Sequence, residues 1–169
     1  MNQEAQILVA AQGDLCQVQV SGRATFKIAQ HLRDYVLRRL KAGLRRLILD
    51  FSECTALDST FMGVLAMIGL EARGRCEVVF VNVGPANRKL LDGLGVSRLF
   101  KFAEAPVAEV NWQTLCQAAA QVSDMSAIAG TVLDAHQTLM ALEPENIPKF
   151  QSVVEMLRAE VAAATPPKS

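Results

Sequence analysis

The sequence predicts a small α/β domain, in which helices pack on a mixed β-sheet, followed by a C-terminal helical extension. Strand-like and helix-like segments alternate through the first hundred residues, which is typical of parallel strands joined by right-handed crossovers. The turn Gly13-Asp14 between the first two strand-like runs predicts an opening β-hairpin. Near Ala105 the apolar pattern changes, and a surplus of basic residues gives way to a surplus of acidic ones. We therefore expect a domain over 1–104 and an extension over 105–169.

Each element of the domain follows from a local pattern. The second strand-like run alternates apolar and polar residues, which indicates one buried face. Apolar side chains recur at helical spacing over 26–42, and Thr25 can cap the start of this helix. Unbroken apolar runs at 45–51 and 76–82 favour strands covered on both faces. In chain order we expect strands at 7–12 and 15–20, a helix at 26–42, a strand at 45–51, a helix at 59–73, a strand at 76–82, a helix at 85–94 and a short strand at 98–102.

The extension is expected to be mostly helical, with a first helix at 111–123. In 125–142 and 147–161 apolar residues recur at spacings of three and four, which predicts two amphipathic helices. Pro144 and Pro148 separate these two segments. Both apolar seams should be buried, either against the domain or each other, or in a homodimer or partner interface through these helices.

Composition and charge disfavour several classes of function. Lys plus Arg and Asp plus Glu each number 17, so the formal net charge is zero and the chain lacks the basic surface of a typical nucleic-acid binder. The longest apolar run, 61–70, is much shorter than the roughly 20 residues of a membrane-spanning helix. No signal-peptide pattern begins the sequence. We expect a cytoplasmic protein with no membrane and no nucleic-acid partner.

The residues that usually bind metals or perform catalysis are scattered. The four cysteines stand apart, and His31 and His136 have no ligand or nucleophile pattern beside them. The stretch 83–89 contains a glycine but lacks the spacing of a phosphate loop. The sequence therefore predicts reduced, mostly buried thiols, with no metal site, no cofactor and no catalytic residue.

A polar triplet, Asp58-Ser59-Thr60, stands where the strand at 45–51 and its loop give way to a helix. These side chains commonly accept hydrogen bonds from free N–H groups at a helix start, so the triplet alone predicts a capping role. In sheets of this kind, functional loops lie beyond the carboxyl ends of the parallel strands. The triplet occupies such a place and is therefore the first candidate for a functional site.

The stretch 44–69 resembles the STAS domain of bacterial anti-sigma factor antagonists. That family has an apolar strand, a loop and a helix start of the type D-S-[ST]-G-x-G. Asp58 and Ser59 match the motif's aspartate and its phosphorylated serine. Thr60 matches the following hydroxyl residue, and Gly63 matches the second glycine.

A second stretch, 81–102, resembles the family's next strand and its helix of pattern V-x-x-L-L-x-x-x-G-L, so the resemblance extends over residues 5–104. Two places depart from the family. Phe61 replaces the motif's first glycine, and it is a partner contact if exposed and a packing residue if buried. Arg23 and Thr25 stand where the family commonly has an acidic residue near the site.

The resemblance implies a binding module and not an enzyme. It implies an anti-sigma factor antagonist that sequesters an anti-sigma factor serine kinase while Ser59 is unphosphorylated, and a PPM-type serine phosphatase that resets it. The implied partner-binding residues are Asp58, Ser59, Thr60, Phe61 and Thr25. Phosphorylation adds about −1.5 to −2 charges, which a helix start tolerates. The expected result is a lost interface with an intact fold.

Two other classes of function are considered. A STAS accessory subunit, such as one bound to the ATPase of a lipid-transport ABC system, shares the fold and has a hydroxyl residue at this position. A small α/β enzyme is disfavoured by the absence of a nucleophile arrangement, metal ligands and a phosphate loop in the sequence. A neighbouring gene for a serine kinase or phosphatase would favour the antagonist, and transporter genes would favour the accessory subunit.

Overall fold

The computed structural model describes residues 4–117 and 125–164. Its elements, in chain order, are β1 (Gln6–Gln12), β2 (Leu15–Ala24), α1 (Phe26–Lys41), β3 (Arg46–Leu57), α2 (Ser59–Ala72), β4 (Glu77–Val81), α3 (Pro85–Gly93), the 3-10 turn η1 (Val96–Leu99), β5 (Lys101–Ala103), β6 (Gln113–Gln117), α4 (Met125–Leu142), the 3-10 turn η3 (Pro144–Asn146) and α5 (Ile147–Ala164). The expected order of strands and helices in the first hundred residues is confirmed. Across the described ranges, no helix has both the length and the apolar character needed to cross a membrane.

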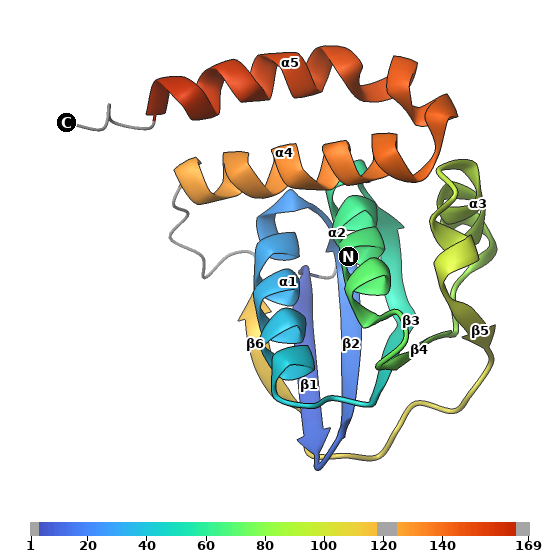
Figure 1. Cartoon of the computed structure of the whole chain (residues 1–169). Helices are drawn as coiled ribbons and strands as arrows, with labels where there is room; N and C mark the ends of the chain where they lie inside the picture. The colour runs from blue at the N-terminus through green and yellow to red at the C-terminus, as the bar shows by residue number, and fades with distance from the viewer. Residues whose placement is uncertain (1–3, 118–124, 165–169) are drawn as a thin grey trace.

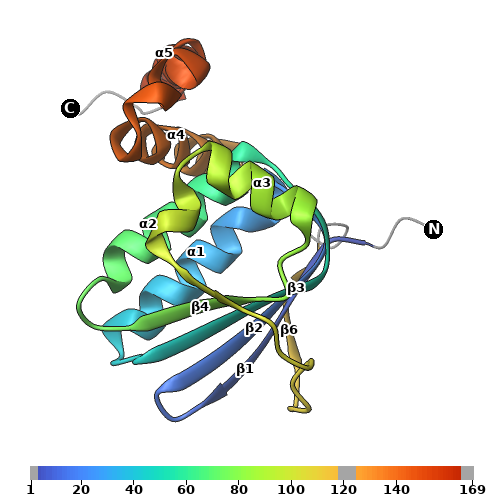
Figure 2. The same ribbon diagram turned by 90° about the vertical axis from the view of Figure 1, so that its right-hand side faces the viewer.

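The strands form one six-stranded mixed sheet in the order β5-β4-β3-β2-β1-β6, so β6 of the expected extension completes the sheet of the expected domain. The strands β2 to β5 pair in parallel, and β1 is antiparallel to both β2 and β6. Helices α1 and α2 cover one face of the sheet (Figures 1 and 2). Their apolar side chains, such as Ile28 and Leu65, are buried together with Leu47 and Leu49 of β3. The predicted fold class is confirmed, because this is a mixed sheet packed by helices.

The starts of α1 and α2 lie at the same edge of the sheet. Parallel strands β2 and β3 are neighbours, and each leads directly into a helix, β2 into α1 and β3 into α2. The amide of Asp58, at the end of β3, donates a 3.0 Å hydrogen bond to the carbonyl of Ala24, at the end of β2. The two strand-to-helix turns are therefore held side by side.

The expected helix over 111–123 is wrong where the structure describes it, because residues 113–117 form β6. This strand pairs with the outer edge of β1 in antiparallel fashion, with Cys116 opposite Ile7. Both of these side chains are buried. The free backbone groups of an edge strand attract another strand, and this long-range pairing overrides the local helical pattern. The rest of the expected helix lies outside the described residues.

Helices α4 and α5 form a hairpin on the domain. Helix α4 crosses α1 and α2 near their N-terminal ends, and α5 packs on the outer side of α4 (Figure 1). The expected burial of the two seams is confirmed at their centres, at Ala135 and Leu139 in α4 and at Val154 in α5. Met125 is 71 % exposed, because the first turn of α4 lies beyond the helices on which its centre packs. The centres of the two seams are thus buried against the rest of the chain and against each other, whereas Met125 and Ile147 at their starts are exposed.

Truncation after Glu104 is predicted to lower solubility and stability. It removes β6 from the edge of β1 and α4 from the ends of α1 and α2, which exposes an unpaired strand and apolar side chains. Each apolar side chain that returns to water costs about 1.5–3 kcal/mol. Size-exclusion chromatography and thermal melts of the truncated and full chains measure the effect. A truncated domain that stays monomeric, soluble and equally stable would show that the extension is an independent module.

Candidate functional site

The site is built around Asp58, the residue between β3 and α2. Its Oδ1 atom accepts a hydrogen bond of 2.7 Å from the amide of Phe61, so it caps the start of α2. Its Oδ2 atom accepts a hydrogen bond of 2.8 Å from the amide of Phe26, the first residue of α1. A single carboxylate therefore satisfies free N–H groups at the starts of two helices.

The electrostatic environment of Asp58 has two opposing parts. Burial raises the pKa of its carboxyl above the ordinary value, and the hydrogen bonds from Phe61 and Phe26 oppose part of this increase. A pKa that is higher in the folded protein means that the folded state binds this proton more tightly than the unfolded state. The stability that comes from this tighter proton binding at Asp58 is therefore fully present below the unfolded pKa and is lost as the pH rises through the folded pKa.

Ser59 is the first residue of α2, which confirms its predicted position at a helix start. The side chain is half-buried, and its Oγ atom lies 2.9 Å from Nε2 of His136 in α4. The other ring nitrogen of His136, Nδ1, lies 2.7 Å from the carbonyl oxygen of Val132. Because a carbonyl only accepts hydrogen bonds, Nδ1 carries a proton, and in the neutral ring Nε2 accepts the hydroxyl proton of Ser59. The hydroxyl is accessible only in part.

The remaining motif residues point inward. Thr60 is 4 % exposed and Phe61 is 0 % exposed. Of the two alternatives for Phe61, the structure therefore shows the packing residue, and both side chains lie below the surface of the site. Thr25 is half-buried and caps α1, accepting a hydrogen bond of 3.4 Å from the amide of Lys27. Arg23 is exposed.

Gly63 lies one turn beyond Ser59, at a place where α2 and α4 approach closely. A Cβ atom built on Gly63 would lie 2.5 Å from the carbonyl oxygen of Ala135, a distance that real Cβ atoms do not tolerate. The glycine of the motif thus has a packing role in this chain, because it allows α4 to approach the backbone of α2.

His136 is the site residue that the sequence analysis missed. It lies 77 positions from Ser59, and no local pattern connects the two. The available signal was the presence of a histidine next to the apolar seam of Val132, Ala135 and Leu139, since a polar ring in such a place needs a hydrogen-bonding partner when buried.

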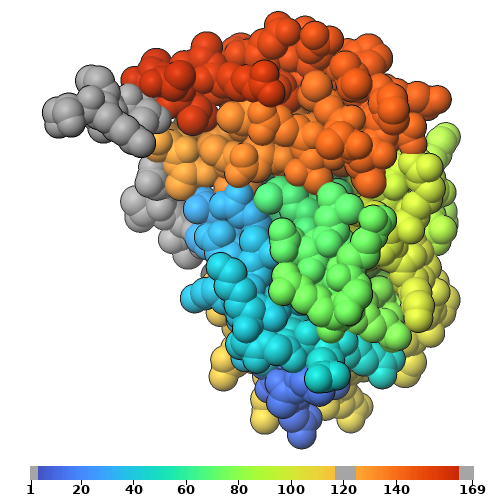
Figure 3. All heavy atoms as spheres, in the orientation of Figure 1, coloured from blue at the N-terminus to red at the C-terminus, as the bar shows by residue number. Residues whose placement is uncertain are grey.

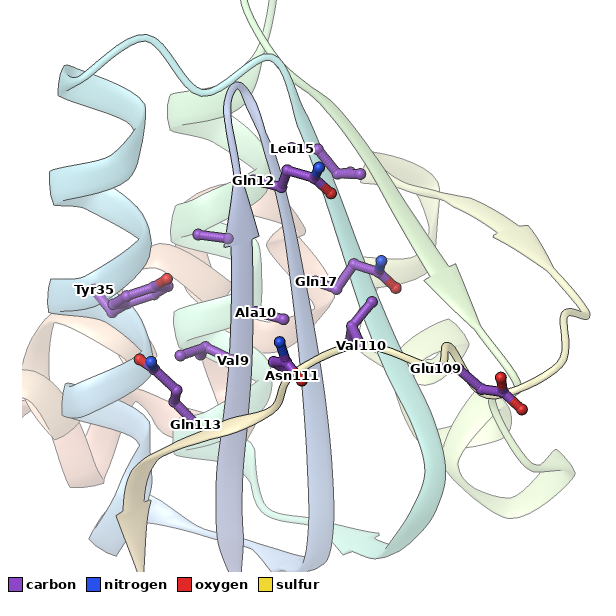
Figure 4. A pocket seen from close by; sticks show the side chains of 11 residues that line it. Val9, Ala10, Gln12, Leu15, Gln17, Tyr35, Glu109, Val110, Asn111 and Gln113 are labelled. Carbon is purple, nitrogen blue, oxygen red and sulfur yellow. The ribbon is translucent and has the colours of Figure 1, made fainter.

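Among the residues that the structure describes, no second cluster of potential catalytic or metal-binding side chains is present outside this site. All four cysteines are free, and in residues 4–117 and 125–164 no group of three or more His, Cys, Asp and Glu side chains could hold a metal ion. A hollow of about 550 Å³ lies between β1, β2 and the segment 109–113, and Figure 4 shows Tyr35 at one end of it and Glu109 at the other. Burial and a contact with Cys16 raise the pKa of Tyr35 to about 12. These two titratable groups do not converge as an acid–base pair would.

Replacing Asp58 by alanine is predicted to destabilise the fold by about 1–4 kcal/mol, since each lost N-cap costs roughly 0.5–2 kcal/mol. Asp58→Asn should lie between alanine and wild type, because an amide keeps one acceptor oxygen of the two. Urea denaturation measures both. Asp34→Ala, which removes an exposed carboxylate from α1, is the matched control and should change stability by less than about 1 kcal/mol. Equal stability of the two alanine variants would contradict the double cap.

Known proteins are similar to this chain in sequence and in fold. A family model described as "Mlab, STAS domain" matches residues 7–101, a range that ends before β6, α4 and α5. A STAS-domain containing protein of Pseudomonas aeruginosa, strain UCBPP-PA14, is 31 % identical over 97 residues, which cover 57 % of this chain and 95 % of that protein.

Solved structures of anti-sigma factor antagonists share the fold. The unphosphorylated form of the antagonist SpoIIAA aligns with a TM-score of 0.52 at 15 % identity, covering 60 % of this chain and 89 % of that one. The phosphorylated form of SpoIIAA from Bacillus aligns with a TM-score of 0.52 at 14 % identity, covering 60 % and 92 %. An antagonist from Mycobacterium paratuberculosis aligns with a TM-score of 0.52 at 22 % identity, covering 58 % and 84 %. The chain belongs to the STAS domain family.

Proposed function

We propose that this protein is an anti-sigma factor antagonist, a binding module that sequesters an anti-sigma factor serine kinase until the kinase phosphorylates Ser59. The observation that supports this most directly is the position of Ser59, in the first turn of α2 at the carboxyl end of a parallel strand. Similarity of the fold to anti-sigma factor antagonists, one of them solved in a phosphorylated form, is consistent with it.

The physical basis of the switch is a change of charge that the fold tolerates and an interface does not. A phosphate on Ser59 would lie at the positive end of the α2 dipole, where an anion is mildly stabilising. The same phosphate adds about −1.5 to −2 charges next to Asp58. A partner that docks on this turn would meet both the repulsion and the cost of removing water from the phosphate.

The remaining steps belong to other proteins. The kinase supplies the phosphoryl group, a PPM-type serine phosphatase removes it, and the exchange takes place in the cytoplasm, where sigma factors act. The proposal therefore needs no catalytic residue in this chain. An accessory subunit of a lipid-transport ABC system is the alternative, and it would bind a transporter ATPase in place of a kinase.

Ser59→Asp is predicted to leave the fold intact and to weaken kinase binding at least tenfold, which corresponds to about 1.4 kcal/mol. The thermal midpoint should change little, because the carboxylate lies at a helix start. Calorimetric titration against each anti-sigma factor serine kinase of the same organism measures the affinity, and thermal melts run beside it.

Ser152→Asp is the matched control, since Ser152 is an exposed serine on α5. It should bind as wild type does, and Ser59→Ala should keep its affinity. Loss of folding in Ser59→Asp would show that the site is structural. Equal binding by both aspartate variants would contradict the switch, and binding to a transporter ATPase alone would support the accessory subunit.

A further inference from the structure

Helix α4 covers the part of α2 that contains the candidate switch. Ser59 and Gly63 are four positions apart, so they lie on the same face of α2. His136 of α4 contacts the first of them and Ala135 contacts the second. Figure 3 shows the orange atoms of α4 lying against the blue atoms of α1 and the green atoms of α2.

The face of α4 that covers Ser59 is closely packed. Ala135, Leu139 and His136 of α4 are all buried. The ring of His136 is held by the Val132 carbonyl on its own helix and by an edge contact with Phe150 of α5, at a centroid distance of 5.0 Å. The imidazole is therefore positioned by contacts within the α4–α5 hairpin itself, in addition to its contact with Ser59.

The hairpin is also anchored away from Ser59. Asn146, at the turn between α4 and α5, donates a 2.9 Å hydrogen bond to the carbonyl of Leu94 in the domain. Arg33 of α1 pairs with Asp134 of α4 at 3.4 Å, and Arg98 pairs with Glu143. Both of these ion pairs are partly exposed, and such pairs add little stability. Apolar burial along α4 therefore supplies most of the free energy that holds the hairpin on the sheet and its helices. Helix α5 lies on the far side of α4 from the sheet (Figure 2).

We propose that α4 is an intramolecular competitor for the surface around Ser59, so that a serine kinase reaches this hydroxyl only when the α4–α5 hairpin has moved away. The inference rests on the proposed function and names the regulation of the same site. In phosphoryl transfer the Ser59 oxygen attacks the γ-phosphorus of ATP held by the kinase, the hydroxyl proton passes to a base, and ADP leaves. The attacking oxygen must face the nucleotide, but while α4 is packed on α2 it faces Nε2 of His136 instead.

Gly63→Ala is expected to detach α4 from α2 without weakening α2 itself. Alanine is a better helix former than glycine, so α2 itself is not weakened. The added methyl group would collide with the backbone of Ala135, which has no flexible side chain to move aside. Gly130→Ala is the matched control, because it makes the same substitution on α4 at a position with open space around it.

The test measures access to position 59 in the full chain. Ser59→Cys introduces a thiol there, and its alkylation by iodoacetamide is followed by peptide mass spectrometry, which separates it from the native cysteines. We expect the thiol to react at least tenfold faster when Gly63→Ala is added and within twofold of the starting rate when Gly130→Ala is added. Hydrogen–deuterium exchange should show faster exchange in α4 for Gly63→Ala only, with α1 and α2 still protected.

Equal alkylation rates and equal exchange in α4 for all three chains would overturn the proposal. If Gly63→Ala prevents folding, His136→Ala replaces it, and it should raise both rates in the same direction. Unchanged rates in that variant would also overturn the proposal. No kinase takes part in this experiment, so the cover can fail while the switch at Ser59 stands. The switch can equally fail in the binding titrations while the cover stands.

Discussion

The carboxylate of Asp58 is the constraint on which the site depends. One oxygen holds the start of α2 and the other holds the start of α1, at 2.7 Å and 2.8 Å. Because the strands that lead into these helices are parallel neighbours, the two turns lie close enough for one side chain to serve both. This arrangement fixes Ser59 in the first turn of α2, beside the edge of the sheet rather than within its core. The position of the serine follows from the capping of two helices.

The same surface shows how the C-terminal helices are integrated with the domain. The family match covers residues 7–101, whereas α4 and α5 follow later in the chain. Gly63 belongs to the motif, yet in this chain it also provides the space into which Ala135 packs. A residue of the motif at 58–63 is therefore also a contact point for α4. On our proposal a partner that binds at Ser59 displaces this packed helix, so partner affinity would include the cost of that displacement.

The parts of the molecule that depend on local sequence patterns could be predicted from the sequence. Apolar periodicity and capping residues placed the strands and helices of the first hundred residues, and the Asp58-Ser59 pair was assigned to a helix start. Features that depend on contacts between segments far apart in the sequence could not be predicted. Residues 113–117 form a strand by pairing with the edge of β1, a segment distant in the sequence. His136 is brought to Ser59 by the packing of α4 on α2. The burial of Phe61 likewise depends on the packed core and was left open by the sequence.

The most direct test of the account is to map phosphate on this chain after incubation with Mg-ATP and the serine kinase that binds it. Mass spectrometry would follow wild type, Ser59→Ala, Gly63→Ala and Gly130→Ala over time. The account predicts phosphate at Ser59, none in Ser59→Ala, and faster incorporation in Gly63→Ala than in wild type or Gly130→Ala. Phosphate at another residue, or equal rates in the wild-type and Gly63→Ala chains, would contradict it.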